Sequence, residues 1–266
     1  MKKIGFIGMG HMACDMAKGF VVSNVVSREN LFAYARNQEK LKANAQKIGF
    51  TACRSMESLV STCDVIIIAV NPDEVKNVTG VIKENMKDTA IVLSVASSVK
   101  LFAYEAQIGD DKRIARVMPN TLIAPKKGYS AICYNEKMDA KGKEFCVNLL
   151  SALGQAVEIE EELFDAFTAF SCTGPLWIYK FIEAMTDAGV YVGFARDKAR
   201  NMVLQNLIGT AQLLSDSNAS PAEMVDKMTS PGGNTIEGVK ALYENGMANP
   251  IMESMSAVLA RCRARG

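Results

Sequence analysis

Short apolar runs alternate with amphipathic stretches through the first 160 residues of the chain. The runs are rich in β-branched residues and apolar at successive positions, as is typical of parallel strands that are covered on both faces. They lie at residues 3–8, 31–35, 64–70, 89–96, 113–118, 129–134 and 155–159, with helical patterns at 11–23, 38–49 and 139–153. This alternation predicts a doubly wound α/β domain over residues 1–160.

The pattern changes after about residue 160, and no strand pattern follows. Apolar residues recur at helical spacing over residues 163–170, 175–193, 196–216 and 249–265. We therefore predict an all-helical domain over residues 161–266. Several of its helices, such as the segment 201–214, are apolar on more than one face, although a domain of this size has little core. A dimer interface is the expected explanation, and a self-contained helical bundle is the alternative.

Charge and cysteine content narrow the classes further. The chain has 30 basic and 29 acidic residues, so it lacks the positive surplus typical of partners of nucleic acids or anionic membranes. The apolar run 65–70 is far too short to span a membrane, and residues 1–15 resemble a strand entering a turn more than a signal peptide. Seven scattered cysteines indicate a reduced, cytoplasmic protein. The single histidine, His11, excludes a histidine-rich metal centre, and we predict no metal.

The stretch GFIGMGHMA matches the dinucleotide-binding pattern G-x-G-x-x-A directly after a predicted strand. Gly8 permits the tight turn, Gly10 lets a pyrophosphate approach the backbone, and Ala13 keeps the helix close to the strand. His11 would face the phosphates or cap the helix, and we expect no catalytic role for it. We assign Gly8, Gly10, His11, Met12 and Ala13 to a cofactor site of the Rossmann type. A glycine-rich turn without a ligand is the alternative.

The second predicted strand ends in YARNQEK, where NAD-binding proteins normally carry an acidic residue. Arg36 and Asn37 occupy that position instead. Because an arginine accommodates the 2′-phosphate, NADPH is the favoured cofactor, with NADH possible. A solvated loop arginine is the alternative.

Further segments follow the fingerprint in a fixed order along essentially the whole chain. They are AVNP (69–72), SVASSV (94–99), RVMPNT (116–121), SCTGP (171–175) and TSPGGNTIEG (229–238). Together they resemble the pyrroline-5-carboxylate reductase family. The resemblance implies an enzyme that reduces the cyclic imine 1-pyrroline-5-carboxylate to L-proline with NADPH or NADH. It also implies a Rossmann domain followed by a helical domain that interlocks into dimers, which often assemble into rings.

The resemblance also implies functional positions. On the cofactor side they are Ser55, Ala69, Val70, Asn71, Pro72, Ala96, Ser97 and Asn120, with Met118 and Pro119 beside the nicotinamide end. On the substrate side they are Thr168, Ser230, Gly233, Asn234 and Thr235.

Three segments depart from the family pattern. The family usually has Ser-Gly-Ser-Gly-Pro in place of SCTGP, followed by a small residue and an aromatic where this chain has Leu176 and Trp177. It usually has lysine in place of Asn71, and proline in place of Leu122. The first departure lies near the expected substrate pocket. It could tune that pocket, or mark a paralogue that acts on a related imine or on nothing.

Two other functions remain open. A β-hydroxyacid dehydrogenase shares the two-domain plan, but its lysine motif would need different spacing around Lys180 and an asparagine at Ala184. A non-catalytic NADP-binding regulator would keep the fingerprint. Imine reduction itself needs little acid–base machinery, because a protonated imine is already electrophilic and the cofactor supplies the hydride.

The segment TSPGGNTIEG combines a stiff turn with the start of a helix. Pro231 and the glycines make the turn. Asn234 is predicted to be the N-cap, with Glu237 completing a capping box. The helix is predicted to run over residues 235–245, with Gly246 at its C-terminal cap. The N–H groups of the first turn would then hold the substrate carboxylate. A well-capped helix without a ligand is the alternative.

Overall fold

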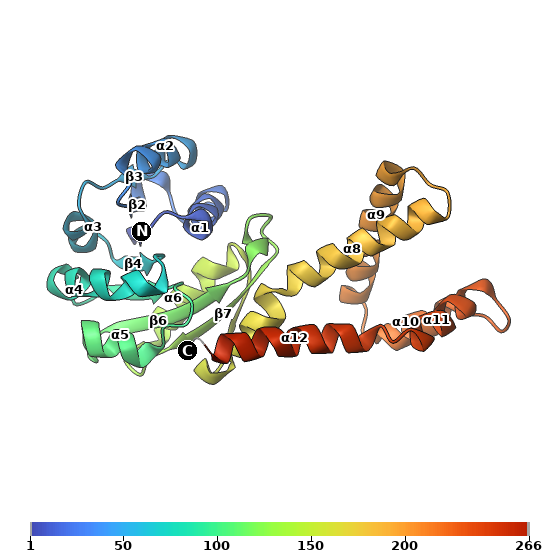
Figure 1. Ribbon diagram of the computed structural model, residues 1–266. Helices are drawn as coiled ribbons and strands as arrows, with labels where there is room; N and C mark the ends of the chain where they lie inside the picture. The colour runs from blue at the N-terminus through green and yellow to red at the C-terminus, as the bar shows by residue number, and fades with distance from the viewer. Residues whose placement is uncertain (1, 265–266) are drawn as a thin grey trace. The chain divides into compact units, whose positions relative to one another are not determined.

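The computed structural model describes residues 2–264 and places an eight-stranded sheet in the first part of that range (Figure 1). Each predicted apolar run forms a strand, with ends that differ from the predicted ones by at most two residues. One strand, β3, was not predicted, because two residues are too short to show an alternation. The strands are β1 (Ile4–Ile7), β2 (Leu31–Tyr34), β3 (Thr51–Ala52), β4 (Val65–Ile68), β5 (Ile91–Ser94), β6 (Arg113–Pro119), β7 (Gly128–Tyr134) and β8 (Gly154–Glu158).

The strands lie in the order β3-β2-β1-β4-β5-β6-β7-β8. Strands β1 to β6 are parallel, and their order reverses between β1 and β4, as in a doubly wound fold. The expectation of a parallel sheet is wrong for its last part, because β7 runs antiparallel to β6, with β8 parallel to β7. Only residues 120–127 connect β6 to β7, and a parallel crossover needs a dozen or more residues.

Helices cover both faces of the sheet, which explains why its strands are apolar at successive positions. The helices of this part are α1 (His11–Val22), α2 (Gln38–Ile48), α3 (Met56–Thr62), α4 (Val75–Asn85), α5 (Leu101–Ile108) and α6 (Ala140–Ser151). One apolar cluster joins the sheet to α1, α2 and α6, and a second joins it to α3, α4 and α5 (Figure 1). Alternate residues of each strand enter alternate clusters: Val65 and Ile67 of β4 enter the first, and Ile66 and Ile68 the second.

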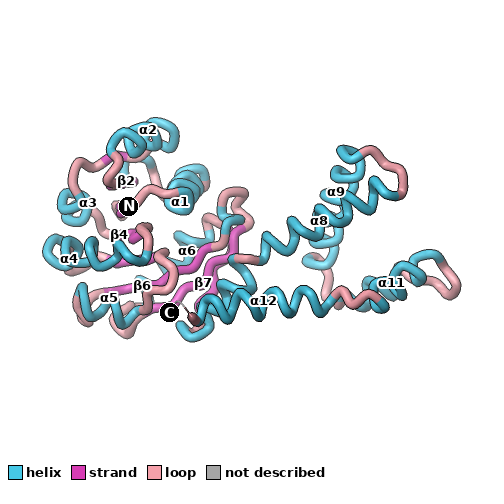
Figure 2. The backbone as a smooth tube through the Cα atoms, in the orientation of Figure 1, coloured by secondary structure: helices cyan, strands magenta, loops and turns pink. Residues whose placement is uncertain are grey.

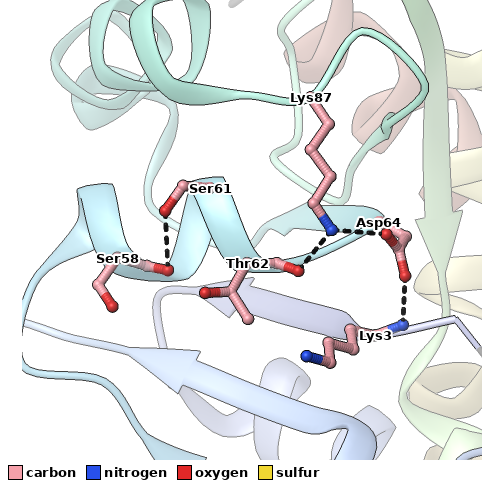
Figure 3. Close-up of polar contacts among 6 residues, drawn as sticks. All are labelled: Lys3, Ser58, Ser61, Thr62, Asp64 and Lys87. Atoms are coloured by element: carbon pink, nitrogen blue, oxygen red, sulfur yellow. Dashed lines mark hydrogen bonds and ion pairs between the residues drawn. The ribbon is translucent and has the colours of Figure 1, made fainter.

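A polar network ties β4 to its neighbours at the end of the sheet where the parallel strands begin (Figure 3). The carboxylate of Asp64 accepts hydrogen bonds from the backbone N–H of Lys3 at 2.9 Å and from Nζ of Lys87 at 2.8 Å. The Lys87 Nζ also donates to the carbonyl of Thr62 at 2.7 Å. Partial burial raises the pKa of Asp64, but these two hydrogen bonds and the nearby charges of Lys87 and Lys2 together lower the pKa overall.

We expect Asp64→Asn to lower the free energy of unfolding by about 1 kcal/mol at pH 7, in urea titrations. The value is modest because the Lys87 and Asp64 side chains are 38% and 34% exposed. Since the folded-state pKa is lowered, the contribution is complete above about pH 4 and is lost as the pH falls through the folded pKa. The stability gap between the variant and the wild type should therefore narrow towards pH 3. Asp88→Asn is the control, because Asp88 pairs with Lys112 while 94% exposed, and little effect is expected.

The residues after β8 form helices and connecting loops, as predicted (Figure 2). Glu161–Leu163 is a 3-10 turn, and Thr168–Cys172 is a π-helical turn. The α-helices are α7 (Phe164–Phe167), α8 (Gly174–Tyr191), α9 (Arg196–Ser215), α10 (Pro221–Met228), α11 (Asn234–Glu244) and α12 (Ala248–Arg263).

The chain divides into two compact units, one of Met1–Cys172 with Leu259–Gly266 and the other of Thr173–Val258. Phe164 lies in the second apolar cluster of the sheet, so the first unit continues past β8. The predicted domain boundary near residue 160 stays a prediction. Met1, Arg265 and Gly266, at the ends of the predicted domains, lie outside the described residues.

Helices α8 and α9 pack closely in the second unit. A Cβ atom added to Gly189 would lie 2.7 Å from the Cβ of Ala199, so glycine allows the close approach. Arg196 Nη1 donates to Asp187 Oδ1 at 2.6 Å across the pair. Many large apolar side chains of this unit nevertheless remain exposed, among them Ile208 and Leu213 of α9.

Candidate active site

The fingerprint turn joins β1 to α1 as the sequence predicts. Gly8 has φ +95°, and a Cβ atom on it would lie 2.3 Å from the carbonyl oxygen of Ala69, so the turn requires glycine. Gly10 is the N-cap of α1, and no side chain caps that helix. A Cβ atom on Gly10 would meet nothing within 4 Å, which leaves open space in front of the first-turn N–H groups. The geometry suits a pyrophosphate bound at a helix N-terminus.

The other fingerprint residues have separate places. Ala13 is buried against the sheet, as predicted for close packing of helix and strand. Met12 is partly buried and packs on the same cluster. His11 is exposed and makes no capping hydrogen bond, so capping of α1 by His11 is wrong, and contact with a phosphate stays a prediction.

A cavity of about 500 Å³ opens next to this turn, where β1, β2 and β4 end. It brings together seven of the predicted cofactor residues: Gly8, Gly10, Arg36, Asn37, Ala69, Val70 and Asn71. Pro72 and Ser55 adjoin residues that line the cavity, and Ser55 serves as the N-cap of α3 by accepting from the N–H of Ser58 at 3.2 Å. The size and the lining suit the adenosine part of a dinucleotide.

Charged residues gather at one side of this cavity. The Arg36 side chain is 83% exposed and forms an ion pair with Glu74, which also lines the cavity together with Lys40. Asn37 caps α2 by accepting from the N–H of Lys40 at 2.9 Å. Sequence reasoning missed Glu74, which follows the AVNP segment within the turn after β4. An arginine that can reorient between a carboxylate and a phosphate fits the 2′-phosphate of NADP.

The loop after β5 lies at the same edge of the sheet as the turn after β4, because β4 and β5 are parallel neighbours. Ala96 is buried and its N–H donates to Oγ of Ser94 at 3.2 Å, while Ser97 is exposed. Ser94 Oγ lies 2.5 Å from the hydroxyl of Tyr104. Burial raises the pKa of Tyr104 to about 12. Ser98 has φ +64°, an uncommon conformation for serine.

Asn120, after β6, is buried with its side-chain amide engaged. Its Oδ1 accepts from the N–H groups of Leu122 at 3.1 Å and Tyr129 at 3.2 Å, and its Nδ2 donates to Ser171 at 3.4 Å. These bonds shape the connection from β6 to β7. Contact between Asn120 and a cofactor stays a prediction.

The departure SCTGP begins in the π-helical turn Thr168–Cys172, a feature that is frequent at functional sites. Thr168 Oγ1 donates to the carbonyl of Phe164 at 2.8 Å, and Cys172 Sγ donates to the carbonyl of Pro119 at 3.8 Å. Burial raises the pKa of Cys172 to about 12, so it is a thiol rather than a reactive thiolate at neutral pH. The cysteine therefore changes packing, and adds no nucleophile.

The TSPGG turn lies in the second unit. The N–H of Gly233 donates to the carbonyl of Ser230 at 2.9 Å, with Pro231 and Gly232 between them and φ +68° at Gly232. These are the features of a type II turn. A Cβ atom on Gly233 would lie 2.4 Å from Oγ of Ser230, so this position also favours glycine.

The predicted capping of α11 is wrong. Gly233 is the N-cap, in an extended conformation and without a capping side chain, and Asn234 is the first helical residue. The helix begins one residue before the predicted start, because the type II turn ends at Gly233 and leaves that residue in the extended conformation of an N-cap. The capping box occurs instead on α10, between Ser220 and Glu223. The helix ends at Glu244 with Asn245 as its C-cap, one residue before the predicted end, and Gly246 follows the C-cap with φ +68°.

Lys180, the residue that a hydroxyacid dehydrogenase would need, is an exposed residue of α8. It forms an ion pair with Glu183, whose hydrogen bond raises the pKa of Lys180 and keeps it protonated. No group of three or more potential metal ligands occurs within residues 2–264. None of the seven cysteines, all of them in the described part of the chain, forms a disulfide.

A doubly wound sheet with a glycine turn, an uncapped α1 and an arginine after β2 defines a Rossmann-type, dinucleotide-binding oxidoreductase. Residues 3–98 match the family model for coenzyme F420-dependent NADP oxidoreductases, and residues 161–265 match that for pyrroline-5-carboxylate reductase dimerisation. A pyrroline-5-carboxylate reductase from Aquifex aeolicus is 35% identical over 255 residues, which are 96% of this chain and 94% of that protein. The chain belongs to the pyrroline-5-carboxylate reductase family, which confirms the predicted resemblance.

Two solved structures agree in fold over the whole chain. The pyrroline carboxylate reductase of Plasmodium falciparum, solved with NADP bound, has a TM-score of 0.88 and 30% identity, and covers 100% of this chain and 98% of its own. A pyrroline-5-carboxylate reductase from Coxiella burnetii has a TM-score of 0.92 and 25% identity, with the same coverage. Among the described helices, none is long and apolar enough to cross a membrane.

Proposed function

We propose that this protein reduces 1-pyrroline-5-carboxylate to L-proline, with NADPH as the hydride donor. The main support is the 35% identity to the Aquifex aeolicus reductase, which extends over 96% of the chain. The absence of a general acid or base among the assigned residues suits this chemistry, because a protonated imine accepts hydride without further activation. A bound nicotinamide would supply the hydride, and the protein's task is to hold the imine carbon against it.

We propose that the residues around the 500 Å³ cavity hold the adenosine half of NADPH. The bare N-terminus of α1 would bind the pyrophosphate, and Arg36 would bind the 2′-phosphate after releasing Glu74. Ser55 and Pro72 are proposed to flank this half. Ala96, Ser97 and Asn120 are proposed to lie towards the nicotinamide, since their loops follow the next strands of the sheet.

We propose that the start of α11 receives the substrate carboxylate, with Thr168 also bordering the substrate. The uncapped helix start offers the N–H groups of Asn234 and Thr235, and the hydroxyls of Ser230 and Thr235 could add donors. Because Gly233 has no side chain, nothing on the N-cap residue competes with a carboxylate for these N–H groups.

The proposed function is tested by a reductase assay with purified full-length protein, 1-pyrroline-5-carboxylate, and NADPH or NADH. Proline should form in proportion to the cofactor oxidised, and faster with NADPH. The six-membered cyclic imine carboxylate is the comparison substrate, because the SCTGP departure could change the shape of the pocket. A protein that binds NADPH tightly and reduces neither imine would contradict the proposal and favour a regulator.

We propose that the protein self-associates through its second unit, as a dimer or a larger ring, and that it works in the cytoplasm. Its near-equal numbers of basic and acidic residues suggest neither nucleic acid nor a membrane surface as a partner. The exposed apolar side chains of α8, α9 and α11 supply the kind of surface that oligomer interfaces bury.

Sedimentation at micromolar concentration should give at least a dimer. Ile208→Arg, on α9, should shift the protein towards monomer, because burying an unpaired guanidinium in an apolar interface costs several kcal/mol, roughly 3–5. Val22→Arg is the matched control, since Val22 and Ile208 are 57% and 65% exposed but Val22 lies on α1. A wild-type protein that sediments as a monomer would contradict the interlocked arrangement.

A further inference from the structure

Arg116 is a buried arginine on an interior strand of the sheet and is 3% exposed. It lies on β6 between Ile114 and Met118, which both belong to the apolar cluster under α3, α4 and α5. The ring of Phe164 lies 4.5 Å from its guanidinium carbon. Placing a charge in such surroundings is costly unless the charge is paired and fully hydrogen-bonded.

The pairing of Arg116 is incomplete. Its Nη1 donates to Oε1 of Glu161 at 2.9 Å, and its Nε is buried without a hydrogen-bond partner among the described residues. Arg116 is buried and the Glu161 side chain is 23% exposed. An ion pair that buries a charge is a poor source of stability, because an apolar pair of the same size often stabilises the fold as well or better. Stability alone therefore does not explain why Arg116 and Glu161 are paired here.

Glu161 links this arginine to the loop after β5. The same Oε1 that pairs with Arg116 also accepts from the N–H of Leu101 at 2.8 Å. Leu101 is the first residue of α5 and directly follows the loop 95–100. At its other end the loop is held by Ser94, whose Oγ accepts from the N–H of Ala96. A hydrogen bond therefore holds each end of the loop, and Ser98, with its positive φ, lies between the two ends.

The topology places this loop beside the reacting half of the cofactor. The cavity with Arg36 lies over the ends of β1, β2 and β4, on the side of the sheet that takes the adenosine half. A doubly wound sheet binds the two mononucleotide halves on either side of the point where the strand order reverses. The other half therefore lies over the ends of β4, β5 and β6, where loop 95–100 is the connection after β5.

We infer that Glu161, held in place by Arg116, is a positioning residue that fixes the loop 95–100 against the nicotinamide half. The substrate in this inference depends on the proposed function, whereas the role of the loop towards the cofactor does not. Hydride transfer depends steeply on the distance between donor and acceptor, so a small displacement of this loop would slow the reaction without preventing binding of the adenosine half.

The test uses full-length protein and four variants. Glu161→Asp keeps the charge but shortens the side chain, so that one oxygen can no longer serve both Arg116 and Leu101. Glu161→Gln leaves Arg116 charged and buried, and could fail to fold. The double variant Arg116→Met with Glu161→Gln avoids that problem by removing both charges. Glu162→Gln is the control, because Glu162 is the exposed neighbouring carboxylate.

Three quantities are measured for each variant: kcat for the imine, the Kd of NADP⁺ and the Kd of 2′,5′-ADP. We expect Glu161→Asp and the double variant to lower kcat about tenfold or more while the Kd of 2′,5′-ADP changes less than about twofold. Glu162→Gln should match the wild type. A purely structural role would change kcat only in proportion to the fraction of protein that binds 2′,5′-ADP.

The Kd values keep the inference testable even if the protein does not reduce pyrroline-5-carboxylate. In that case the variants should lose the extra affinity that NADP⁺ has over 2′,5′-ADP, because this difference reports the nicotinamide half alone. A folded double variant with wild-type kcat would overturn the inference. If the wild type reduces no imine, a folded double variant with an unchanged ratio of the two Kd values would overturn it.

Discussion

Arg36→Ala should raise the KM for NADPH about tenfold or more and leave the KM for NADH nearly unchanged. Arg36 lines the cavity beside the fingerprint turn, and its side chain is 83% exposed, so its guanidinium can turn from Glu74 towards a 2′-phosphate there. A charge-assisted contact of this kind contributes roughly 1.5–3 kcal/mol. NADH lacks the 2′-phosphate, so the substitution removes no such contact from it. The measurement is steady-state kinetics with each cofactor at saturating imine.

The ion pair with Glu74 supplies a second arm of the same experiment. Glu74 competes with the phosphate for Arg36 and repels it, so Glu74→Gln should lower the KM for NADPH. The change should be up to about fivefold, since exposed ion pairs contribute about 1 kcal/mol or less. Equal effects of Arg36→Ala on the two cofactors, together with no effect of Glu74→Gln, would show that this arginine does not bind the 2′-phosphate.

Asn234→Pro should lower kcat/KM for pyrroline-5-carboxylate by roughly ten- to a hundredfold without weakening NADPH binding. Asn234 is the first residue of α11, where proline is tolerated, and the extended Gly233 before it suits a following proline. The substitution deletes one N–H donor at the start of the helix. A hydrogen bond to a charged carboxylate contributes roughly 1.5–3 kcal/mol, which sets the expected loss.

Two controls separate the backbone from the side chains at this turn. Asn234→Ala keeps the N–H and removes the amide, and Thr235→Val removes only a hydroxyl. Both should lose less than the proline variant. Proline at Thr235 is a poorer test, because it would disfavour the helical conformation of Asn234. If Asn234→Pro folds and keeps wild-type kcat/KM, the turn is a helix start only, and the carboxylate binds elsewhere.

Local patterns predicted most of the sheet and the glycine turn beside the cavity. A strand buried on both faces must be apolar at successive residues, and a turn that lets a pyrophosphate approach must lack side chains. Local sequence is therefore enough to predict the strands β1, β4 and β5 and the turn at Gly8 and Gly10. Arg36 was predictable for the same reason, because its place after β2 follows from the Rossmann pattern.

The start of α11 shows where a local pattern was insufficient. Asn-Thr-Ile-Glu has the composition of a capping box, yet Gly233 occupies the N-cap. The preceding turn decides the register, since a type II turn with φ +68° at Gly232 brings Gly233 into an extended conformation. Capping preferences contribute about 1 kcal/mol, which is less than the conformational demands of the turn and of the helix together.

By itself the sequence determined that the chain starts with a dinucleotide-binding α/β domain, ends in helices and belongs among the pyrroline-5-carboxylate reductases. Only the tertiary structure decided that β7 runs antiparallel to β6, that Glu74 meets Arg36, and that Glu161 joins Arg116, 45 residues away, to the N-terminus of α5. The physical reason is that periodicity and turn chemistry act over a few neighbouring residues. Contacts between distant segments depend instead on how the whole sheet is connected and packed.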